Sequence, residues 1–338
     1  MHSTDDSVGC VEQVSSQVWR IELPLPLRDL RSVNAYVVSA GDGATIIDPG
    51  FATEESERVL LRSLAELGLT LQDISQILVT HLHWDHYSQA LKFQREQGIS
   101  VGLGRGEQDA IARASEQEFM YGDQAVLLAR AGAESLAESV RYLEPESFER
   151  GIVIGPPDEW IDPGSQINCG STYLVAHATP GHTQGHLVFE KPDDGLMFTG
   201  DHVLPRITPS IGFEPCPTPR ALQTYLNSLR LLVDHGPRTM LPAHGALGGD
   251  VRIRAEELLE HHELRLNEIE ALVTTQGCTA YDIARRMRWT RKLRSIEELS
   301  AVHAMSAVLE VEAHLWVLES HGRVYSDRSG PTHLYTAK

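Results

Sequence analysis

The sequence predicts an α/β fold followed by a mostly helical C-terminal unit, and three observations support this class. Short apolar runs at 74–79, 196–200 and 240–243 are typical of buried strands, and a polar motif follows each of them. Farther along the chain, apolar residues recur at helical spacing instead. The chain has 338 residues, more than the roughly 100–200 of a usual domain. We therefore expect two units, residues 1–249 and residues 250–338.

The first polar motif, His-Leu-His-Trp-Asp-His, begins at His81 and follows the first strand-like run. Side chains two residues apart on an extended chain point the same way, so His81, His83 and Asp85 are expected to converge. His86 would reach the same point from the turn that follows. A helix is expected to start at about Ser88, with its N-terminus facing these side chains.

Three further polar residues follow turn-like or strand-like segments. His182 comes after a Pro-Gly turn, in which glycine is expected to let the backbone approach a metal site closely. Asp201 and His244 each follow an apolar run and are expected at strand tips. With the first motif, they supply five imidazoles and two carboxylates, which are donors that zinc prefers. That number of donors fits two metal ions better than one.

These four ordered motifs resemble the pattern of the metallo-β-lactamase superfamily, in which H-x-H-x-D-H is followed by His, Asp and His at strand ends. The resemblance covers about residues 17–249, and Asp48-Pro49-Gly50 is similar to the early Asp-x-Gly turn of that fold. It implies an αββα sandwich, in which two β-sheets lie face to face with helices outside and a di-metal centre at one edge. It also implies a ligand set in which the first metal is held by His81, His83 and His182, the second by Asp85, His86 and His244, and Asp201 bridges the two.

A metal-dependent hydrolysis follows from this ligand set. We expect two zinc ions per chain, with iron or manganese as alternatives. A metal can lower the pKa of bound water from ~15.7 to about 7, so a zinc-bound hydroxide is the expected nucleophile. We predict catalytic roles for Asp85, which would orient the hydroxide or pass its proton to the leaving group, and for His202, which would donate a hydrogen bond to the substrate. His186 is expected to hold the loop that carries His182.

Departures from related patterns narrow the substrate. Resistance-type β-lactamases commonly carry Arg where this chain has His86 and Cys where it has Asp201, whereas flavodiiron proteins carry Glu in place of His83. Segment 179–186 resembles the glyoxalase II and β-lactamase-like protein 2 forms most. We therefore predict hydrolysis of a thioester, ester or lactone carbonyl in a small-molecule or carrier-linked acyl substrate. The alternatives are a ribonuclease that uses the same centre and an iron persulfide dioxygenase, which would leave His86 idle.

Charge and cysteine usage bear on partners and location. The formal net charge of −18 disfavours a nucleic acid partner, because an acidic surface repels a phosphate backbone. Segment 285–294 nevertheless holds six basic residues and Trp289, and it either grips a phosphate of RNA or of a pantetheine-type carrier, or is a solvated loop. The four cysteines are far apart, which argues against a disulfide framework.

No secretory signal is visible in the polar first 12 residues, so we expect a cytoplasmic protein. The sequence has no run of 18 apolar residues, so no membrane span is expected, and it leaves the oligomeric state open.

The C-terminal unit is expected to contain three helices and a hairpin. Apolar positions from Leu258 to Val273 fit one long amphipathic helix, a short capped helix follows Thr279, and a third runs from about Ile296 to Leu318. A turn at 321–325 then leads into a strand. This order resembles a winged-helix-like unit, similar to tails in the β-lactamase-like protein 2 group.

Two segments are expected to form lids over the metal site. The long stretch between the first two motifs, 104–159, is rich in Ala, Glu and Leu and should be helical in several pieces. Within it, 119–122 offers an apolar wall, and 207–213 is placed for the same role shortly after Asp201.

Overall fold

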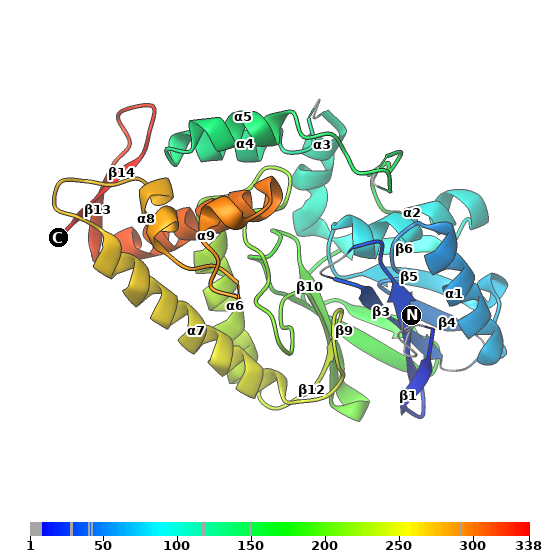
Figure 1. Cartoon of the computed structure of the whole chain (residues 1–338). Coiled ribbons are helices and arrows are strands. Elements are labelled where there is room, and N and C mark those ends of the chain that lie inside the picture. The colour runs from blue at the N-terminus through cyan, green and yellow to red at the C-terminus, as the bar shows by residue number, and fades with distance from the viewer. Residues whose placement is uncertain are drawn as a thin grey trace.

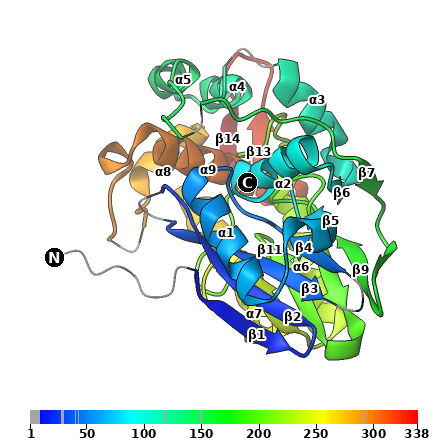
Figure 2. The same cartoon turned by 90° about the vertical axis from the view of Figure 1, so that its right-hand side faces the viewer.

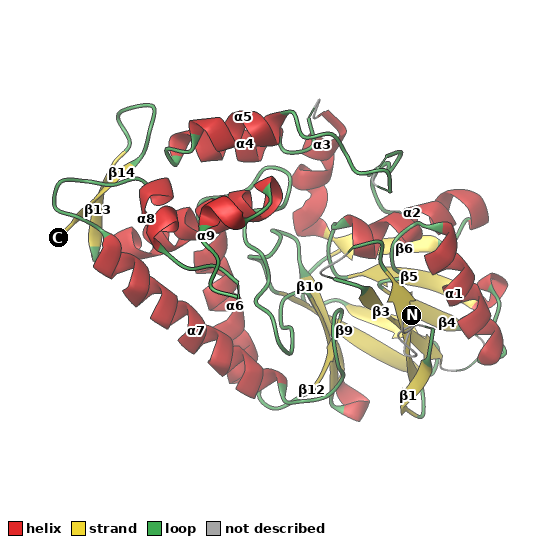
Figure 3. Cartoon of the chain, viewed as in Figure 1, coloured by secondary structure: helices red, strands yellow, loops and turns green. Residues whose placement is uncertain are grey.

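Two β-sheets face each other at the centre of the fold, with helices on both outer sides (Figures 1 and 3). The computed structural model describes residues 9–27, 30–39, 41, 43–116, 119–148, 150–290 and 292–338. Within these residues, the first sheet has seven strands in chain order: β1 Val11–Ser15, β2 Val18–Pro24, β3 Ser32–Ser39, β4 Ala44–Ile47, β5 Ile74–Val79, β6 Ser100–Gly104 and β7 Glu159–Ile161. The second sheet has five, in the order β12 Thr239–Pro242, β11 Leu196–Gly200, β10 Leu187–Lys191, β9 Thr172–Ala178 and β8 Gln166–Cys169.

Apolar side chains from the inner faces of both sheets pack into one layer. Tyr36 and Leu78 from the first sheet belong to the same buried cluster as Leu187, Phe189 and Phe198 from the second. The Tyr36 and Phe198 rings meet edge to face, with their centroids 5.1 Å apart. The predicted face-to-face sandwich is therefore confirmed.

Helices cover the outer face of each sheet (Figure 2). The first sheet is covered by α1 Glu54–Glu66, α2 Trp84–Gln97 and α3 Gln108–Glu116. The second sheet packs against α6 Ala221–His235, and the same apolar core continues through α4 Gly122–Arg130, α5 Glu134–Arg141, α7 Val251–Leu272, α8 Ala280–Arg286 and α9 Ala301–Ser320. The chain ends in a hairpin of β13 Val324–Asp327 and β14 Leu334–Ala337.

The C-terminal helices and hairpin follow each other in the predicted order. The third predicted helix is divided, because a short 3-10 turn at Ile296–Glu298 precedes α9, which starts after the N-cap Ser300. The division at residue 249 and the winged-helix likeness stay predictions, since α7, α8 and α9 share one apolar core with α4, α5 and α6. By length and composition α9 is apolar enough to cross a membrane, but 67% of its most apolar window is buried in this core.

The start of α2 differs from the sequence prediction. The helix begins at Trp84 rather than near Ser88, because the carbonyl of His83 accepts hydrogen bonds from the backbone N–H groups of His86 and Tyr87. An acidic residue in the first turn, Asp85, also suits the positive end of the helix dipole. Asp85 and His86 therefore lie on a helix and not on extended chain.

Parallel pairing brings the strand tips of both sheets to one edge. In the first sheet β4 pairs with β5, and in the second β11 pairs with β12, in each case parallel. Backbone hydrogen bonds join the two sheets at this edge, from Leu187 N–H to the Thr80 carbonyl (2.8 Å) and from Asn34 N–H to the Ala243 carbonyl (2.7 Å). The loops that follow these tips are held close together as a result.

Candidate metal centre

Seven polar side chains converge at this edge, and they are the seven that the sequence predicts. His81 and His244 follow β5 and β12, and Asp201 directly follows β11. Asp85 and His86 come from the first turn of α2, while His182 comes from the loop after β9, and His83 precedes α2. We call His81, His83 and His182 the first ligand group, and Asp85, His86 and His244 the second ligand group. In each group the donor atoms lie within 4.8 Å of one another.

Asp201 lies between the two groups. Its Oδ2 is 3.6 Å from His182 Nε2 in the first group. Its Oδ1 is 3.3 Å from His244 Nε2 and 3.8 Å from His86 Nε2 in the second group. The two oxygens of one carboxylate therefore face different ligand groups, which is the arrangement that a bridging ligand needs.

Hydrogen bonds behind the imidazoles decide which ring nitrogen faces the centre. His182 Nδ1 donates to the Ser210 carbonyl (2.7 Å), and His244 Nδ1 donates to the Ser32 carbonyl (2.8 Å). His86 Nδ1 donates to Asp48 Oδ2 at 3.1 Å. An N–H fixed on one side leaves the Nε2 lone pair of each ring facing inward, as metal coordination requires.

Asp48 organises this outer layer, a role that sequence analysis missed. Besides His86, its carboxylate accepts hydrogen bonds from the backbone N–H and the hydroxyl of Thr80, both at 2.8 Å. Because the Thr80 hydroxyl donates to Asp48, it accepts from His81 Nδ1 at 3.0 Å, and His81 Nε2 is left to face the centre. The Asp-x-Gly turn was a signal for a tight turn only, and it did not predict these contacts.

Several inward-facing atoms have no hydrogen-bond partner among the described residues. They are buried and comprise His86 Nε2, His244 Nε2 and Asp201 Oδ1. In the first group, His83 Nδ1 lies 3.0 Å from both His81 Nε2 and His182 Nε2, so three ring nitrogens crowd one point. Buried polar atoms without partners are costly, and metal cations would satisfy all of these at once. The residues present therefore fit a metal at each ligand group.

Burial and neighbouring charges separate the pKa values of the two groups. Burial, with further contributions from nearby imidazoles, lowers the pKa of His83 to about 3 and of His182 to about 4. Burial also lowers the pKa of His86, but the carboxylates of Asp85, Asp48 and Asp201 outweigh it and raise the value to about 10. Without metal, the second group therefore holds a proton that a bound cation would displace.

A comparison with known protein families agrees with this geometry. The family model described as "Metallo-beta-lactamase superfamily" matches residues 28–244, which is more than half of the chain and includes all seven side chains. The chain belongs to the metallo-β-lactamase superfamily. The predicted fold class and the prediction of a metallo-β-lactamase-fold hydrolase are confirmed at this level.

Relatives share this fold along nearly the whole chain. The "Probable metallo-hydrolase YqjP" of Bacillus subtilis is 25% identical over 333 residues, covering 94% of this chain and 97% of that protein. The "Lactamase-like protein nscB" of Aspergillus fumigatus is 26% identical over 318 residues, covering 89% of this chain and 77% of the fungal protein. A metallo-beta-lactamase family protein from Thermus thermophilus superposes with a TM-score of 0.77 at 27% identity, covering 96% of this chain and 100% of the other. The C-terminal helices are thus included in these similarities.

His186 supports the metallo-β-lactamase centre by contacting segments that carry its metal-binding side chains. Its Nδ1 lies 2.9 Å from the Thr179 hydroxyl, at the start of the loop that carries His182. Its Nε2 accepts a hydrogen bond from the Asp201 backbone N–H at 3.3 Å, and its ring stacks on His81 with centroids 5.0 Å apart. The side chain therefore holds the His182 loop, as expected, and also the strand tip that carries Asp201.

His202 lies behind His186 and away from solvent. It is completely buried, and its ring packs against those of His186 and Tyr225 at centroid distances of 5.6 and 4.8 Å. Neither ring nitrogen has a partner among the described residues, and burial lowers the His202 pKa to about 3. A hydrogen bond from His202 to a substrate would need an exposed ring nitrogen, so this placement argues against the predicted catalytic role.

Gly181 is needed for packing against α6. Its φ is +140°, and a Cβ there would lie 2.4 Å from Tyr225 Cα. The structure thus gives this glycine a packing reason, and the expectation that it lets the backbone approach the metal site stays a prediction. Its close neighbour is the helix that supports the His182 loop.

Two buried glutamates brace the loops on either side of the metallo-β-lactamase centre. Glu107 Oε1 accepts hydrogen bonds from the Thr183 hydroxyl (2.5 Å) and the Leu82 backbone N–H (3.3 Å). Glu214 accepts from the backbone and side-chain N–H groups of Gln184 at 2.8 and 3.1 Å. Burial raises the pKa of Glu107 to about 8 and that of Glu214 to about 7. No sequence signal predicted either contact, because both glutamates lie far along the chain from the loops they hold.

The two predicted lid segments contact each other. The Tyr121 and Phe213 rings meet edge to face at a centroid distance of 6.5 Å. The Gln124 side chain on α4 donates hydrogen bonds to the carbonyls of Gly212 (3.3 Å) and Glu214 (2.9 Å). The second segment also contains Ser210, whose carbonyl orients His182, so it is tied to the centre. The lid role itself stays a prediction.

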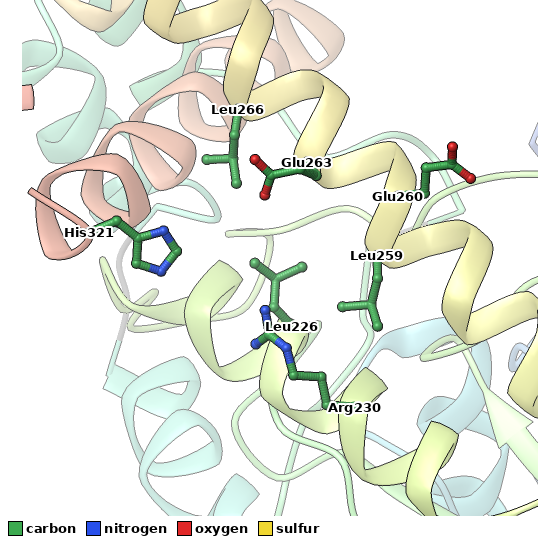
Figure 4. A pocket seen from close by; sticks show the side chains of 7 residues that line it. All are labelled: Leu226, Arg230, Leu259, Glu260, Glu263, Leu266 and His321. Carbon is green, nitrogen blue, oxygen red and sulfur yellow. The ribbon is translucent and has the colours of Figure 1, made fainter. Parts of the chain in front are cut away.

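Two cavities lie near the C-terminal helices. One of about 310 Å³ lies between α6 and α7 (Figure 4), and its lining contains no metal ligand: Leu226, Arg230, Leu259, Glu260, Glu263, Leu266 and His321. The other, of about 230 Å³, starts at Ile211 and Gly212, directly after Ser210. Its wall is mainly apolar and includes Leu127, Pro217, Pro219, Leu309, Ala313 and Trp316, together with the charged or titratable residues Arg130, Glu312, Arg328 and His333. Two residues of the loop that orients His182 thus line the second cavity, whose lining, like that of the first, contains no metal ligand.

Proposed function

We propose that this protein is a di-zinc hydrolase that cleaves a thioester, ester or lactone carbonyl. The observation that carries the proposal is the position of Asp201, whose two oxygens face different ligand groups. One ion would bind to His81, His83 and His182 and the other to Asp85, His86 and His244. When bound, the zinc pair supplies Lewis acidity and an ionised water near neutral pH.

The protein's own residues supply the proton acceptor. Asp85 Oδ2 lies 3.4 Å from His244 Nε2 and 3.6 Å from His86 Nε2. Burial raises the Asp85 pKa, but the two imidazoles outweigh it, so the pKa is lowered and the group stays ionised. A carboxylate at this position can orient the attacking water and pass its proton to the leaving group.

An acyl substrate fits the surroundings of the centre better than RNA does. The cavity of about 230 Å³ is lined mainly by apolar side chains, and two of its lining residues, Ile211 and Gly212, follow Ser210, whose carbonyl orients His182. We propose this cavity as the place for an acyl chain. The names of the relatives, a probable metallo-hydrolase and a lactamase-like protein, agree with hydrolysis at this centre. The likeness to glyoxalase II-type proteins supports the same substrate class.

The basic segment 285–294 lacks the exposed ring that RNA stacking needs. Trp289 is 6% exposed, its indole N–H donates to the Ala284 carbonyl, and the Arg265 guanidinium lies 4.5 Å from its ring centroid. Arg285 pairs with Glu297. Arg291 lies outside the described residues. With a net charge of −18, these contacts favour a small or carrier-linked substrate.

The dioxygenase alternative would leave His86 idle, yet His86 is a well-supported donor. Its Nδ1 is held by Asp48 and its Nε2 faces both Asp85 and Asp201.

All four cysteines are free thiols, Cys10 and Cys216 exposed and Cys169 and Cys278 buried. This agrees with the reducing cytoplasm that we propose as its location.

Metal analysis and a substrate panel test the proposal. We expect purified protein to contain zinc at the centre and to hydrolyse members of a panel of thioesters, esters and lactones. Single-stranded RNA, assayed at several salt concentrations, should not be cleaved. One iron per chain with oxygen uptake on a persulfide, or RNA cleavage without acyl hydrolysis, would overturn it.

A further inference from the structure

A second cluster of metal-ligand residues lies on the outer side of the second sheet. His177 on β9 and His235 at the end of α6 both approach Glu190 on β10. Each Nε2 atom is 2.9 Å from the same carboxylate oxygen, Glu190 Oε2, and the two imidazole centroids are 4.8 Å apart. None of the three residues belongs to the metallo-β-lactamase centre. We infer that this cluster, the β9–α6 cluster, is an additional site that binds a zinc ion.

The geometry needs little adjustment to hold zinc. Zinc binds imidazole nitrogen at about 2.0–2.1 Å and carboxylate oxygen at about 2.0–2.2 Å, so tetrahedral donors lie roughly 3.3 Å apart. Each observed nitrogen–oxygen separation of 2.9 Å would therefore open by a few tenths of an ångström. The side chains of His177 and His235 are 30% and 28% exposed, which leaves room for this movement and for a water as fourth ligand.

Arg238 orients the carboxylate for this role. Its Nε donates to Glu190 Oε1 at 2.7 Å, which leaves Oε2 for the two imidazoles. A hydrogen bond that fixes a ligating carboxylate from behind is the usual support of a metal ligand. The guanidinium also cancels the carboxylate charge, so the imidazoles must supply most of the affinity. The site should therefore prefer zinc or nickel to magnesium or calcium, which favour oxygen ligands.

The β9–α6 cluster fastens two elements that enclose the His182 loop. β9 leads from His177 into this loop within five residues. α6 touches the same loop, since the Ser228 hydroxyl donates to the Pro180 carbonyl at 2.8 Å and Tyr225 packs against Gly181. A zinc ion at the C-terminal end of α6 would join helix and strand on the far side of these contacts. The ion would hold β9 and α6, which support the His182 loop, in place, and it would not contact substrate.

A difference measurement tests the site independently of the proposed function. Full-length protein is stripped of metal, reloaded with excess zinc, freed of unbound metal and analysed for zinc per chain. We expect wild type to retain about one ion more than His177→Ala/His235→Ala. The matched control is His303→Ala/His321→Ala, which removes two exposed histidines elsewhere and should retain as much zinc as wild type. Equal zinc in wild type and the first double variant would overturn the proposal, whatever the content of the centre.

A milder variant covers the case in which the double variant fails to fold. His235→Gln changes a partly exposed residue at a helix end and is expected to keep the fold, as judged by circular dichroism. Titration of metal-free protein with zinc should show one binding event weakened by at least about tenfold, as expected when one ligand of three is lost. An unchanged titration would count against the site. Magnesium should produce no corresponding event in wild type, and an event of equal strength would also overturn the assignment.

Discussion

The metallo-β-lactamase centre and the β9–α6 cluster combine the same chemical groups but neutralise charge differently. At the centre, the carboxylates of Asp85 and Asp201 have no Lys or Arg partner among the described ion pairs and face imidazoles only. In the β9–α6 cluster, Glu190 pairs with Arg238 as well as with two imidazoles. A site that leaves carboxylates without a permanent cation attracts metal strongly and keeps net positive charge for a reaction after loading. In a site with its own guanidinium the carboxylate charge is already offset, so the neutral imidazoles supply most of the affinity for a metal, which suits a structural role.

The largest expected effect separates the two sites by their chemistry. Asp85→Asn should lower turnover by about 10²–10⁴-fold, because the amide cannot accept a proton from the attacking water. The measurement is steady-state hydrolysis of the best substrate of the panel, with circular dichroism to check folding. Asp162→Asn is the control, since among the described residues the ion-pair partner of this exposed carboxylate is surface Arg105. Near-normal turnover of Asp85→Asn would remove Asp85 from the mechanism.

The outer layer of the centre should matter for metal affinity. Asp48→Asn leaves an amide beside His86 Nδ1 and Thr80, and so weakens the hydrogen bonds that orient His81 and His86. We expect zinc affinity at the centre to fall by about 10–100-fold. Competition with a chromophoric chelator measures this, and zinc bound by the β9–α6 cluster should be unaffected. If affinity at the centre does not change, the outer layer does not orient the imidazoles.

The contact between α6 and the His182 loop joins the two sites and can be tested by adding a methyl group. Gly181→Ala places a Cβ against Tyr225 at positive φ, which should cost about 1–3 kcal/mol of the free energy of unfolding. Urea unfolding measures the change. Gly195→Ala is the control, because it also has positive φ but nothing lies within 4 Å of the added Cβ. Equal losses in both variants would show that strain alone, and not the contact with α6, is responsible.

The smallest expected effect concerns two buried glutamates that differ in ionisation. Burial raises the pKa of Glu107 to about 8, whereas at Glu190 burial is outweighed by Arg238 and two imidazoles, so its pKa is lowered. Folding therefore favours protonated Glu107, a contribution fully present below its unfolded value of about 4.5 and lost as pH rises towards 8. The melting temperature of Glu107→Gln should decline less between pH 6 and 9 than that of wild type. Parallel curves would show that Glu107 is ionised in the folded protein.

Sequence analysis located the ligands because their signals are local. An apolar run followed within two residues by His or Asp marks a strand tip, and β5 and β11 end where these runs end, while β12 ends one residue earlier, at Pro242. The boundary of α2 was missed, because His-Trp-Asp-His has no helix-capping residue in the usual position. His83 serves as the N-cap without a side-chain hydrogen bond, so the helix includes Asp85 and His86.

The remaining contacts depend on tertiary structure and have no local signal. Glu107 meets Thr183 across 76 residues, and Glu190 meets His235 across 45. The packing of α6 on the second sheet brings His235 to Glu190, and the pairing of β9 with β10 brings His177 to the same carboxylate. The sequence did not point to His177 and His235 as a site, since a single histidine in a strand or helix pattern gives no indication of its partners. The sequence did not predict the burial of His202 and Trp289 for the same reason, because it depends on contacts with distant parts of the chain.

The apolar core that α9 shares with α4 and α5 links the end of the chain to the metal centre. Gln124, near the start of α4, donates hydrogen bonds to the carbonyls of Gly212 and Glu214, in the loop that follows Ser210. α4 in turn packs against α9 in one apolar core, near the end of the chain. A substitution in the apolar face of α9 can therefore shift α4, and with it the loop that orients His182, without changing any of the seven side chains at the centre.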